Sequence, residues 1–393
     1  MRHLVRMAVA VVIVASLVVS AFGCTSSAPA SPTAAPAATT APAAPAPTAA
    51  AATKAPAPAA TTAPAAAPTT AAPAASGAVI ELKMHHHEPP GSCVSTTLHN
   101  KFAELINQKT NGRVKVTVYP AETLGKSTQA VDLAINGIAD IAWGNLGMFP
   151  GRFPLTEVAA LPMFGVKTAK QGSLMVEELY ETTPEIQKEW SDVHMLFLHD
   201  QDPHFIGLKD KKVQTVEDLK GQRVRSLAGP PLKLFQALGI SPVTVAMPEV
   251  FEAMQKGTID GYSADWVGTV GFKFYQVAKY AVDVPLYPQT FFMVMNKKKW
   301  DSLPPDIQKA ISDVSGMVGA EMYGAGWDKC NEDAKGVATS AGMQPLPISD
   351  TEQAKITKLA APIWDEWVKT ANSKGANGQA LLDKAKSLVE KYK

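Results

Sequence analysis

Residues 223–263 read RVRSLAGPPLKLFQALGISPVTVAMPEVFEAMQKGTIDGYS. Their short apolar runs predict strands, at residues 223–227, 243–245 and 259–263. The segments between these runs have helical spacing and end at Gly239 and Gly257, which predicts helices at residues 231–238 and 248–256. Since short strands that alternate with helices form sheets covered by helices, this stretch predicts an α/β fold.

The same alternation continues on both sides of this stretch. It predicts further strands at residues 79–84, 113–119, 138–143, 193–199, 204–209 and 289–296. It predicts further helices at residues 94–110, 127–136, 170–189, 269–278, 349–372 and 379–392. Residues 304–340 also have helical spacing, and at the α-helical rise a helix of this length reaches about 50 Å, enough to back two lobes. Four glycines in this run predict bends.

The chain divides into a leader, a tether and a body of two lobes. Two predicted strands follow each other in line across Asp200–Pro203, which indicates a crossing between lobes. We therefore assign residues 79–203 and 287–325 to lobe I, and residues 204–286 and 326–393 to lobe II. The crossings near 200–204 and 286–290, together with the long helix, are expected to carry a hinge.

Residues 1–23 have the features of a secretory signal peptide, with Arg2 and Arg6 before an apolar run and small residues before Cys24. The segment resembles a bacterial lipobox, with Ala21 where leucine is usual, so we expect Cys24 to be lipidated. The alternative is an ordinary signal peptide followed by a cysteine without a role. In residues 24–77, 47 of 54 positions are Ala, Pro or Thr, so residues 24–78 predict a disordered tether. No second apolar stretch of about 20 residues follows, which predicts a body anchored outside the membrane.

The charge balance excludes one class of function. Three of the 37 Lys and Arg residues, and none of the 36 Asp and Glu residues, precede residue 79, so the body has a formal net charge of −2. A nucleic-acid-binding protein needs a basic surface, which this balance does not supply. Cys93 and Cys330 can pair in an oxidising compartment, but their separation in sequence leaves the pairing open.

Residues suited to a small organic anion follow several predicted strands. Ligands of open α/β sheets bind beyond the carboxyl ends of the strands. The candidate ligand-binding residues there are His87, Trp143, Asn145, Arg152, Arg225, Asp265 and Trp266. An arginine can bind a carboxylate with two hydrogen bonds, and tryptophan rings can enclose its carbon skeleton.

Each candidate also has a purely structural explanation. Arg225 can form an ion pair within a sheet, Arg152 can be solvated on a loop, and both tryptophans can pack between lobes. The triplet His85–His87 invites a metal site, but adjacent side chains of an extended chain point to opposite faces, and no acidic or cysteine cluster completes a ligand set. We predict no metal site. The sequence contains no GxSxG, HExxH, Walker or CxxC motif, so it does not indicate an enzyme.

Several segments of residues 79–393 together resemble the extracytoplasmic solute-binding proteins of TRAP transporters, the DctP-like family. The segments are GRVKVTVYP (112–120) with Leu124-Gly125, INGIAD (135–140), LPMF (161–164), VEDLKGQRVR (216–225) and EVFEAMQKGTIDG (249–261). Their order and spacing are specific, although each alone is weak. The resemblance implies a two-lobed periplasmic-binding-protein-like fold with a long helix that backs both lobes.

The resemblance also implies a function and a role for Arg225. In this family the matching arginine forms a salt bridge with the ligand carboxylate, and a membrane permease receives the ligand. Contacts are also expected at the positions of Trp143, Asn145, Asp265 and Trp266, and the loop of Arg152 resembles one branch of the family. Asp265 stands where many members have Asn or Glu, which leaves open a cation bound with the ligand; we predict no other cofactor.

These observations predict a lipid-anchored, extracytoplasmic protein that closes on a small organic acid by lobe closure and delivers it to a TRAP permease. The alternatives are a sensor that presents its ligand to a membrane receptor, an enzyme that uses Cys93 with a histidine of 85–87, and an ABC-type binding protein. One arginine and two tryptophans suit dicarboxylates, oxo acids, hydroxy acids, sugar acids and aromatic acids alike, so the sequence does not select the ligand.

Overall fold

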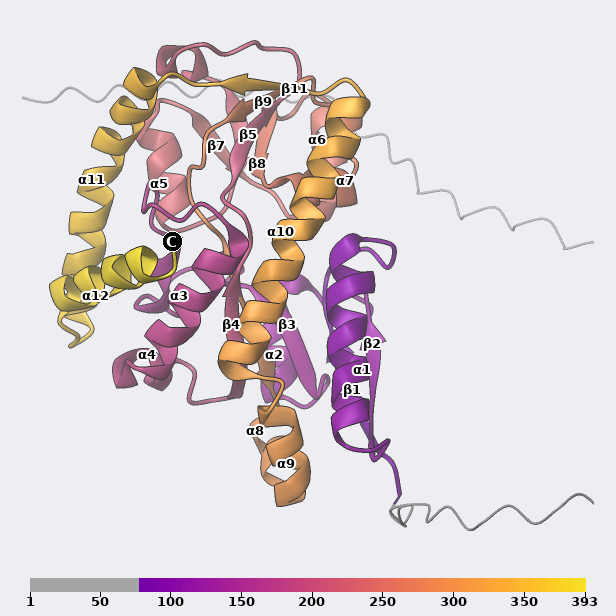
Figure 1. The fold of residues 1–393 in the computed structure, drawn as a ribbon. Helices are drawn as coiled ribbons and strands as arrows, with labels where there is room; N and C mark the ends of the chain where they lie inside the picture. The colour runs from indigo at the N-terminus through magenta and orange to yellow at the C-terminus, as the bar shows by residue number, and fades with distance from the viewer. Residues whose placement is uncertain (1–77) are drawn as a thin grey trace, which may run out of the picture. The chain divides into compact units, whose positions relative to one another are not determined.

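The computed structural model describes residues 78–393 (Figure 1). The predictions on residues 1–77, namely the signal peptide, the lipidated Cys24 and nearly all of the tether, lie outside the described residues. Within the described part of the chain, no helix combines the length and apolar character needed to cross a bilayer.

Two sheets form the body. The first has five strands in the order β2-β1-β3-β10-β4, and the second has six in the order β11-β9-β5-β8-β6-β7. The first contains β1 (Ile80–His85), β2 (Val114–Tyr119), β3 (Ile141–Asn145), β4 (His194–Asp200) and β10 (Thr290–Met295). The second contains β5 (Phe205–Leu208), β6 (Arg223–Ser226), β7 (Ser241–Thr244), β8 (Gly261–Ala264), β9 (Tyr280–Asp283) and β11 (Gln344–Pro347).

Helices cover both sheets, which confirms the predicted α/β class. They are α1 (Asn100–Lys109), α2 (Ala130–Ile135), α3 (Ala169–Glu181), α4 (Pro184–Glu189), α5 (Pro230–Ala237), α6 (Met247–Gln255), α7 (Trp266–Gly271), α8 (Lys297–Asp301), α9 (Pro305–Ser312), α10 (Gly316–Ser340), α11 (Asp350–Ser373) and α12 (Gly378–Lys391). Shorter turns of π- or 3₁₀-helix are η1 (Val94–His99), η2 (Ser127–Gln129), η3 (Leu146–Met148), η4 (Thr156–Ala160), η5 (Val216–Leu219) and η6 (Phe274–Gln276).

Helix α10 lies along both sheets, as predicted. It packs on α3 and β4 beside the first sheet and on α7 beside the second (Figure 1). Glycine makes the close approach to α3 feasible, because a Cβ atom on Gly324 would lie 2.6 Å from the Cα of Lys170. The predicted run 304–340 divides into α9 and α10 at Gly316, where φ is +57° and where the glycines predicted a bend.

The two sheets are joined by paired crossing segments. The chain passes from β4 to β5 through residues 201–204 and returns from β9 to β10 through residues 284–289. The backbone amide of Gln201 donates to the carbonyl of Gln289, and that of His204 donates to the carbonyl of Tyr287 at 2.8 Å. The two crossings therefore lie side by side between the sheets.

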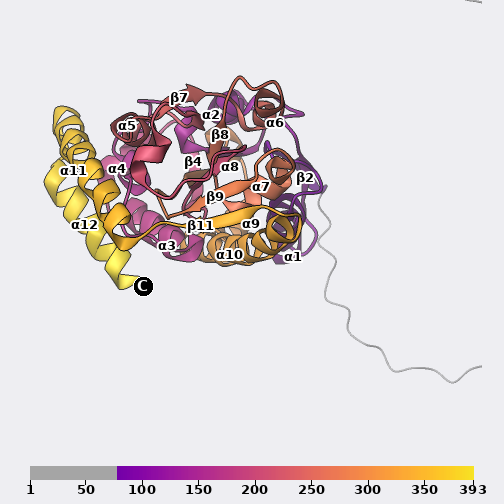
Figure 2. The same ribbon diagram turned by 90° about the horizontal axis from the view of Figure 1, so that it is seen from above.

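The C-terminal helices extend over both sides. Helix α11 packs on α5, whereas α12 packs on α3, so the last helix returns to the side of the first sheet. Figure 2 shows α11 and α12 together at one side of the body. The lobe boundaries given above place all of 326–393 in lobe II and stay a prediction.

Some local expectations differ from the structure. The sequence did not predict β9 and β11, two strands of four residues each. The helix predicted at 269–278 begins instead at Trp266 and ends at Gly271, and Lys273 then adopts a left-handed φ of +60°. A strand of four residues is too short for its hydrophobic periodicity to be recognised, so β9 and β11 were missed. Helix α7 begins earlier than predicted because the side chain of Asp265 caps it and accepts from the amide of Gly268.

Cys93 and Cys330 form a disulfide, with their Cα atoms 5.9 Å apart. It ties the start of η1 to the middle of α10. Disulfides persist in oxidising compartments and are rare in the cytosol, so this bond fits a protein that acts outside it.

Candidate functional site

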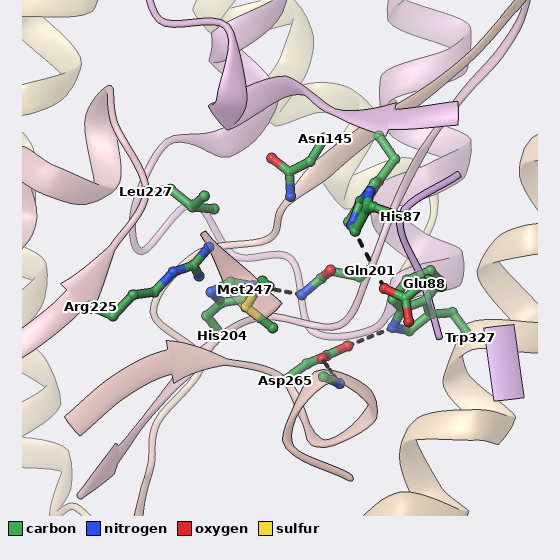
Figure 3. Close-up of a pocket in the computed structure, with 12 residues that line it drawn as sticks. His87, Glu88, Asn145, Gln201, His204, Arg225, Leu227, Met247, Asp265 and Trp327 are labelled. Carbon is green, nitrogen blue, oxygen red and sulfur yellow. Dashed lines mark hydrogen bonds and ion pairs between the residues drawn. The ribbon is translucent and has the colours of Figure 1, made fainter. Parts of the chain in front are cut away.

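A polar cavity lies between the two sheets (Figure 3). It contains about 350 Å³ of space free of protein atoms, part of which is open to solvent. Its lining comes from the ends of β1 and β3, the β4–β5 crossing, β6, α6, the β8–α7 junction, β10 and α10. The lining residues are His87, Glu88, Asn145, Gln201, His204, Arg225, Leu227, Met247, Asp265, Gly268, Phe291 and Trp327.

Arg225 provides a buried positive charge on one side of this cavity. It is 1% exposed, its Nε donates to the carbonyl of Val245 and its Nη1 to that of Ser263, both at 3.0 Å. These two bonds fix the guanidinium, and Nη2 has no hydrogen-bond acceptor among residues 78–393. No acidic side chain of the described residues forms an ion pair with it. Burial lowers the pKa of Arg225 to about 10, so it remains a cation at neutral pH.

Neutral hydrogen-bonding groups surround the arginine. The Oδ1 of Asn145 accepts from the amide of Gly147 at 2.8 Å, which leaves the Nδ2 of Asn145 available as a donor. Gln201 and His204, from the β4–β5 crossing, lie 2.6 Å apart through their Nε2 atoms. The Nδ1 of His204 is 2.8 Å from the Oγ of Ser263. Burial lowers the pKa of His204 well below its usual value, so its ring is neutral.

Aromatic side chains form one wall. Phe291 and Trp327 line the cavity, and Trp143 stacks behind them, 4.5 Å from Phe291 between ring centroids and 4.8 Å from His87. The indole Nε1 of Trp143 donates to the Nε2 of His199 at 2.8 Å, which fixes the ring. Trp143 therefore supports the wall from behind and does not itself line the cavity.

Two acidic side chains lie on the side away from Arg225. Asp265 uses both carboxylate oxygens within the protein, since Oδ1 accepts from the amide of Gly268 at 2.8 Å and Oδ2 from the indole of Trp327 at 2.5 Å. Burial raises the pKa of Asp265 to about 6. Glu88 is 5% exposed, and burial, followed by the charge of Asp265, raises its pKa to about 8. Figure 3 shows Glu88 beside Trp327 and His87, across the cavity from Arg225.

The first two histidines of the triplet His85–His87 lie in the protein interior. His85 and His86 are fully buried, and His86 lies 4.3 Å from the ring of His99. Burial lowers the pKa of His85 to about 4 and of His86 to about 3, which keeps both neutral. In the described part of the chain, no three His, Cys, Asp or Glu side chains are arranged to hold a metal ion.

The structure brings four of the predicted site residues together around the cavity: His87, Asn145, Arg225 and Asp265. Trp143 lies directly behind the wall. Arg152 is exposed and pairs with Asp132 at 2.8 Å, and Trp266 packs on Phe205 with ring centroids 4.4 Å apart. Neither of these last two lines the cavity.

The sequence reasoning missed several lining residues, among them Glu88, Gln201, His204, Phe291 and Trp327. Gln201 and His204 lie in the crossing that the sequence did predict, so its position between the lobes was the available signal. Trp327 lies in the middle of α10. It was missed because candidates were sought only at the ends of predicted strands. Glu88 lies one residue beyond the histidines that were considered.

Buried ionisable groups give the protein an expected pH dependence of stability. Burial raises the pKa of Glu88, Asp202 and Glu177 to about 8, and it lowers the pKa of His199 to about 3. Each of these carboxyls has a higher pKa in the folded protein than in the unfolded one. Its contribution to the free energy of unfolding is therefore fully present below the unfolded pKa, near 4.5 or lower, and is lost as pH rises toward 8. A histidine of this kind contributes stability above about pH 6.5 that is lost as pH falls.

We therefore expect the ligand-free protein to melt at its highest temperature near pH 6.5 and several degrees lower at pH 8.5. Each unit of pKa shift corresponds to about 1.4 kcal/mol of unfolding free energy, so the three carboxyls together are enough to lower the melting temperature measurably. Calorimetry at pH 5, 6.5 and 8.5 measures it, with Glu177→Gln as a variant in which one contribution is removed. A melting temperature at pH 8.5 equal to or above that at pH 6.5 would contradict the assigned burial of these carboxyls.

The fold consists of two α/β halves, and a cavity lined by the buried cation Arg225 lies between them. The family model of DctP, described as bacterial extracellular solute-binding protein, family 7, matches residues 84–370. This chain belongs to the DctP family of TRAP solute-binding proteins, a non-enzymatic family whose members act outside the cytoplasm.

Solved structures agree with this membership. A TRAP solute-binding protein from Rhodoferax ferrireducens T118, in complex with copurified benzoate, is 30% identical, covers 80% of this chain and 98% of its own, and has a TM-score of 0.76. A marine metagenome TRAP solute-binding protein specific for aromatic acid ligands, bound to 3-hydroxybenzoate, is 30% identical, with 80% and 99% covered and a TM-score of 0.75.

Among curated proteins, the outer membrane transporter protein TsaT of Comamonas testosteroni is 28% identical over 299 residues. The match covers 75% of this chain and 87% of TsaT.

Proposed function

We propose that this protein captures a small carboxylate, most favourably an aromatic one, between its two sheets and delivers it to a TRAP permease. The observation that carries the proposal is Arg225, a buried cation of the cavity that has no acidic partner among residues 78–393. A buried charge without a counterion is strongly unfavourable, and a ligand carboxylate supplies the counterion. The free Nη2 of Arg225 and the free amide of Asn145 can each donate to that carboxylate.

The walls support an aromatic skeleton. Phe291 and Trp327 offer flat apolar surfaces, which suit the face or edge of a ligand ring. Relatives at 30% identity hold benzoate and 3-hydroxybenzoate, which supports the same class here.

Capture requires the cavity to open and close. We infer that the paired crossings at 201–204 and 284–289 bend as a hinge, with α10 spanning both halves. Closure would remove the ligand from water and strengthen its bond to Arg225. We further propose that lipidated Cys24 and the tether of residues 24–78 hold the body near the membrane, where the permease accepts the ligand.

A thermal-shift panel tests the ligand class. The purified protein is stripped of bound ligand by unfolding and refolding, then melted with benzoate, 3-hydroxybenzoate, mandelate, galacturonate and succinate, each compared with its uncharged amide. We expect aromatic acids to raise the melting temperature by several degrees, since a ligand at 100 times its Kd stabilises by about 2.7 kcal/mol. Equal shifts with acid and amide, or no shift with any acid, would contradict carboxylate capture.

A further inference from the structure

Glu88 is a buried carboxyl that the binding of a carboxylate does not use. It follows β1 and precedes Pro89, and its carbonyl accepts from the amide of Ala121 at 3.0 Å. This hydrogen bond fixes the backbone at Glu88, and the Glu88 side chain lines the cavity. The Oε2 of Glu88 is buried and has no hydrogen-bond partner among residues 78–393. An unsatisfied buried oxygen costs roughly 1–3 kcal/mol, so its retention in a ligand cavity points to a ligand group that satisfies it.

The charges around the cavity decide what kind of group this is. Arg225 is the one lysine or arginine among the lining residues, and it is used by the ligand carboxylate. A second ligand carboxylate at Glu88 would lie near the charge of Asp265 without a buried cation to balance it.

An ammonium group is disfavoured for a different reason. It would bind best to an ionised Glu88, whereas burial keeps Glu88 protonated at neutral pH. A protonated carboxyl has one donor and one acceptor, and a hydroxyl has the same pair, so the two can exchange hydrogen bonds.

We propose that Glu88 is a specificity-determining residue that binds a hydroxyl group on the ligand, at the end opposite to the carboxylate held by Arg225. The inference rests on the proposed function and narrows it: the ligand is a hydroxylated aromatic monocarboxylate. Glu88 and Arg225 then form the two poles of the site, and the aromatic wall of Phe291 and Trp327 lies between them.

Calorimetric titration of matched acids tests this assignment. The ligands are benzoate, 3-hydroxybenzoate, 4-hydroxybenzoate and 4-hydroxyphenylacetate, with isophthalate as a dicarboxylate and 3-(aminomethyl)benzoate as an ammonium analogue. The variants are Glu88→Leu, which removes both hydrogen-bonding atoms, and Glu88→Gln, which keeps a donor and an acceptor. Glu177→Gln is the matched control, because Glu177 is also a buried acid with a pKa raised to about 8 but lies on α3, outside the cavity.

We expect the wild type to bind at least one hydroxylated acid about tenfold more tightly than its unsubstituted parent, the effect of one buried hydrogen bond. Glu88→Leu should reduce to about one the ratio between the affinities for the hydroxylated acid and its unsubstituted parent. Glu88→Gln should keep most of the preference, and Glu177→Gln all of it.

Three results would overturn the assignment while leaving carboxylate capture intact. They are a wild type without preference for any hydroxylated acid, an unchanged preference in Glu88→Leu, and tighter binding of isophthalate or the ammonium analogue. If Glu88→Leu does not fold, the deciding measurement is the ratio between the wild-type affinities for the hydroxylated acids and for their unsubstituted parents. Absence of binding by every acid would instead overturn the proposed function, and this inference with it.

Discussion

Replacement of Arg225 by alanine is expected to weaken the binding of the preferred carboxylate by about 30-fold or more. Removal of one partner from a buried charge pair typically costs 2–5 kcal/mol, which corresponds to a factor of roughly 30 to several thousand in Kd. Titration calorimetry of the wild type and the variant measures the change. The corresponding amide ligand should bind both proteins equally weakly, because it lacks the charge that Arg225 recognises.

The chain contains a matched control two residues away on the same strand. Arg223 lies on β6, is exposed and pairs with Asp260, with its Nε 3.0 Å from Oδ2. Arg223→Ala removes the same charge from the same strand but outside the cavity, so its Kd should stay within about threefold of the wild type. Equal losses in the two variants would show that net charge or strand stability, and not the Arg225 contact, governs binding.

Loss of the disulfide between Cys93 and Cys330 is expected to lower the free energy of unfolding by about 2–5 kcal/mol. The two cysteines are 237 positions apart, so the bond closes a long loop and restricts the unfolded chain strongly. Urea denaturation of the wild type and of the double variant Cys93→Ser, Cys330→Ser, with and without reductant, measures the effect.

The reductant provides the internal control for this prediction. It should shift the wild-type transition to that of the double variant and leave the double variant unchanged. Equal midpoints for the oxidised wild type and the double variant would contradict a stabilising bond. A shift of the double variant by reductant would show that the effect does not come from this pair.

Much of the fold follows from local sequence. The strand–helix alternation of residues 223–263 predicted β6, α5, β7, α6 and β8 within a few residues at each boundary. Glycines after helices, such as Gly239 with a φ of +73°, mark helix ends because they adopt a left-handed conformation without strain. Strands β9 and β11 pair with each other in parallel and depend on tertiary contacts more than on their own pattern.

The site was predictable in part and for a specific reason. Arg225, Asn145, Asp265 and His87 lie at strand ends, and the rule that ligands bind there leads directly to them. The same rule also selected Arg152 and Trp266, because a rule about position cannot tell which way a side chain turns. Glu88 lies in the segment after β1, and Trp327 lies in the middle of α10, which runs along both sheets. Tertiary packing brings both side chains to the cavity, and no local pattern encodes that packing.

A crystal structure of the protein with its tightest-binding acid tests the central claim most directly. We expect one ligand carboxylate oxygen within about 3.2 Å of Nη2 of Arg225 and the carboxylate within hydrogen-bond distance of Nδ2 of Asn145, with the ligand ring against Phe291 and Trp327. An acid bound elsewhere, for example at Arg152, or bound in this cavity with its carboxylate turned away from Arg225, would contradict the account.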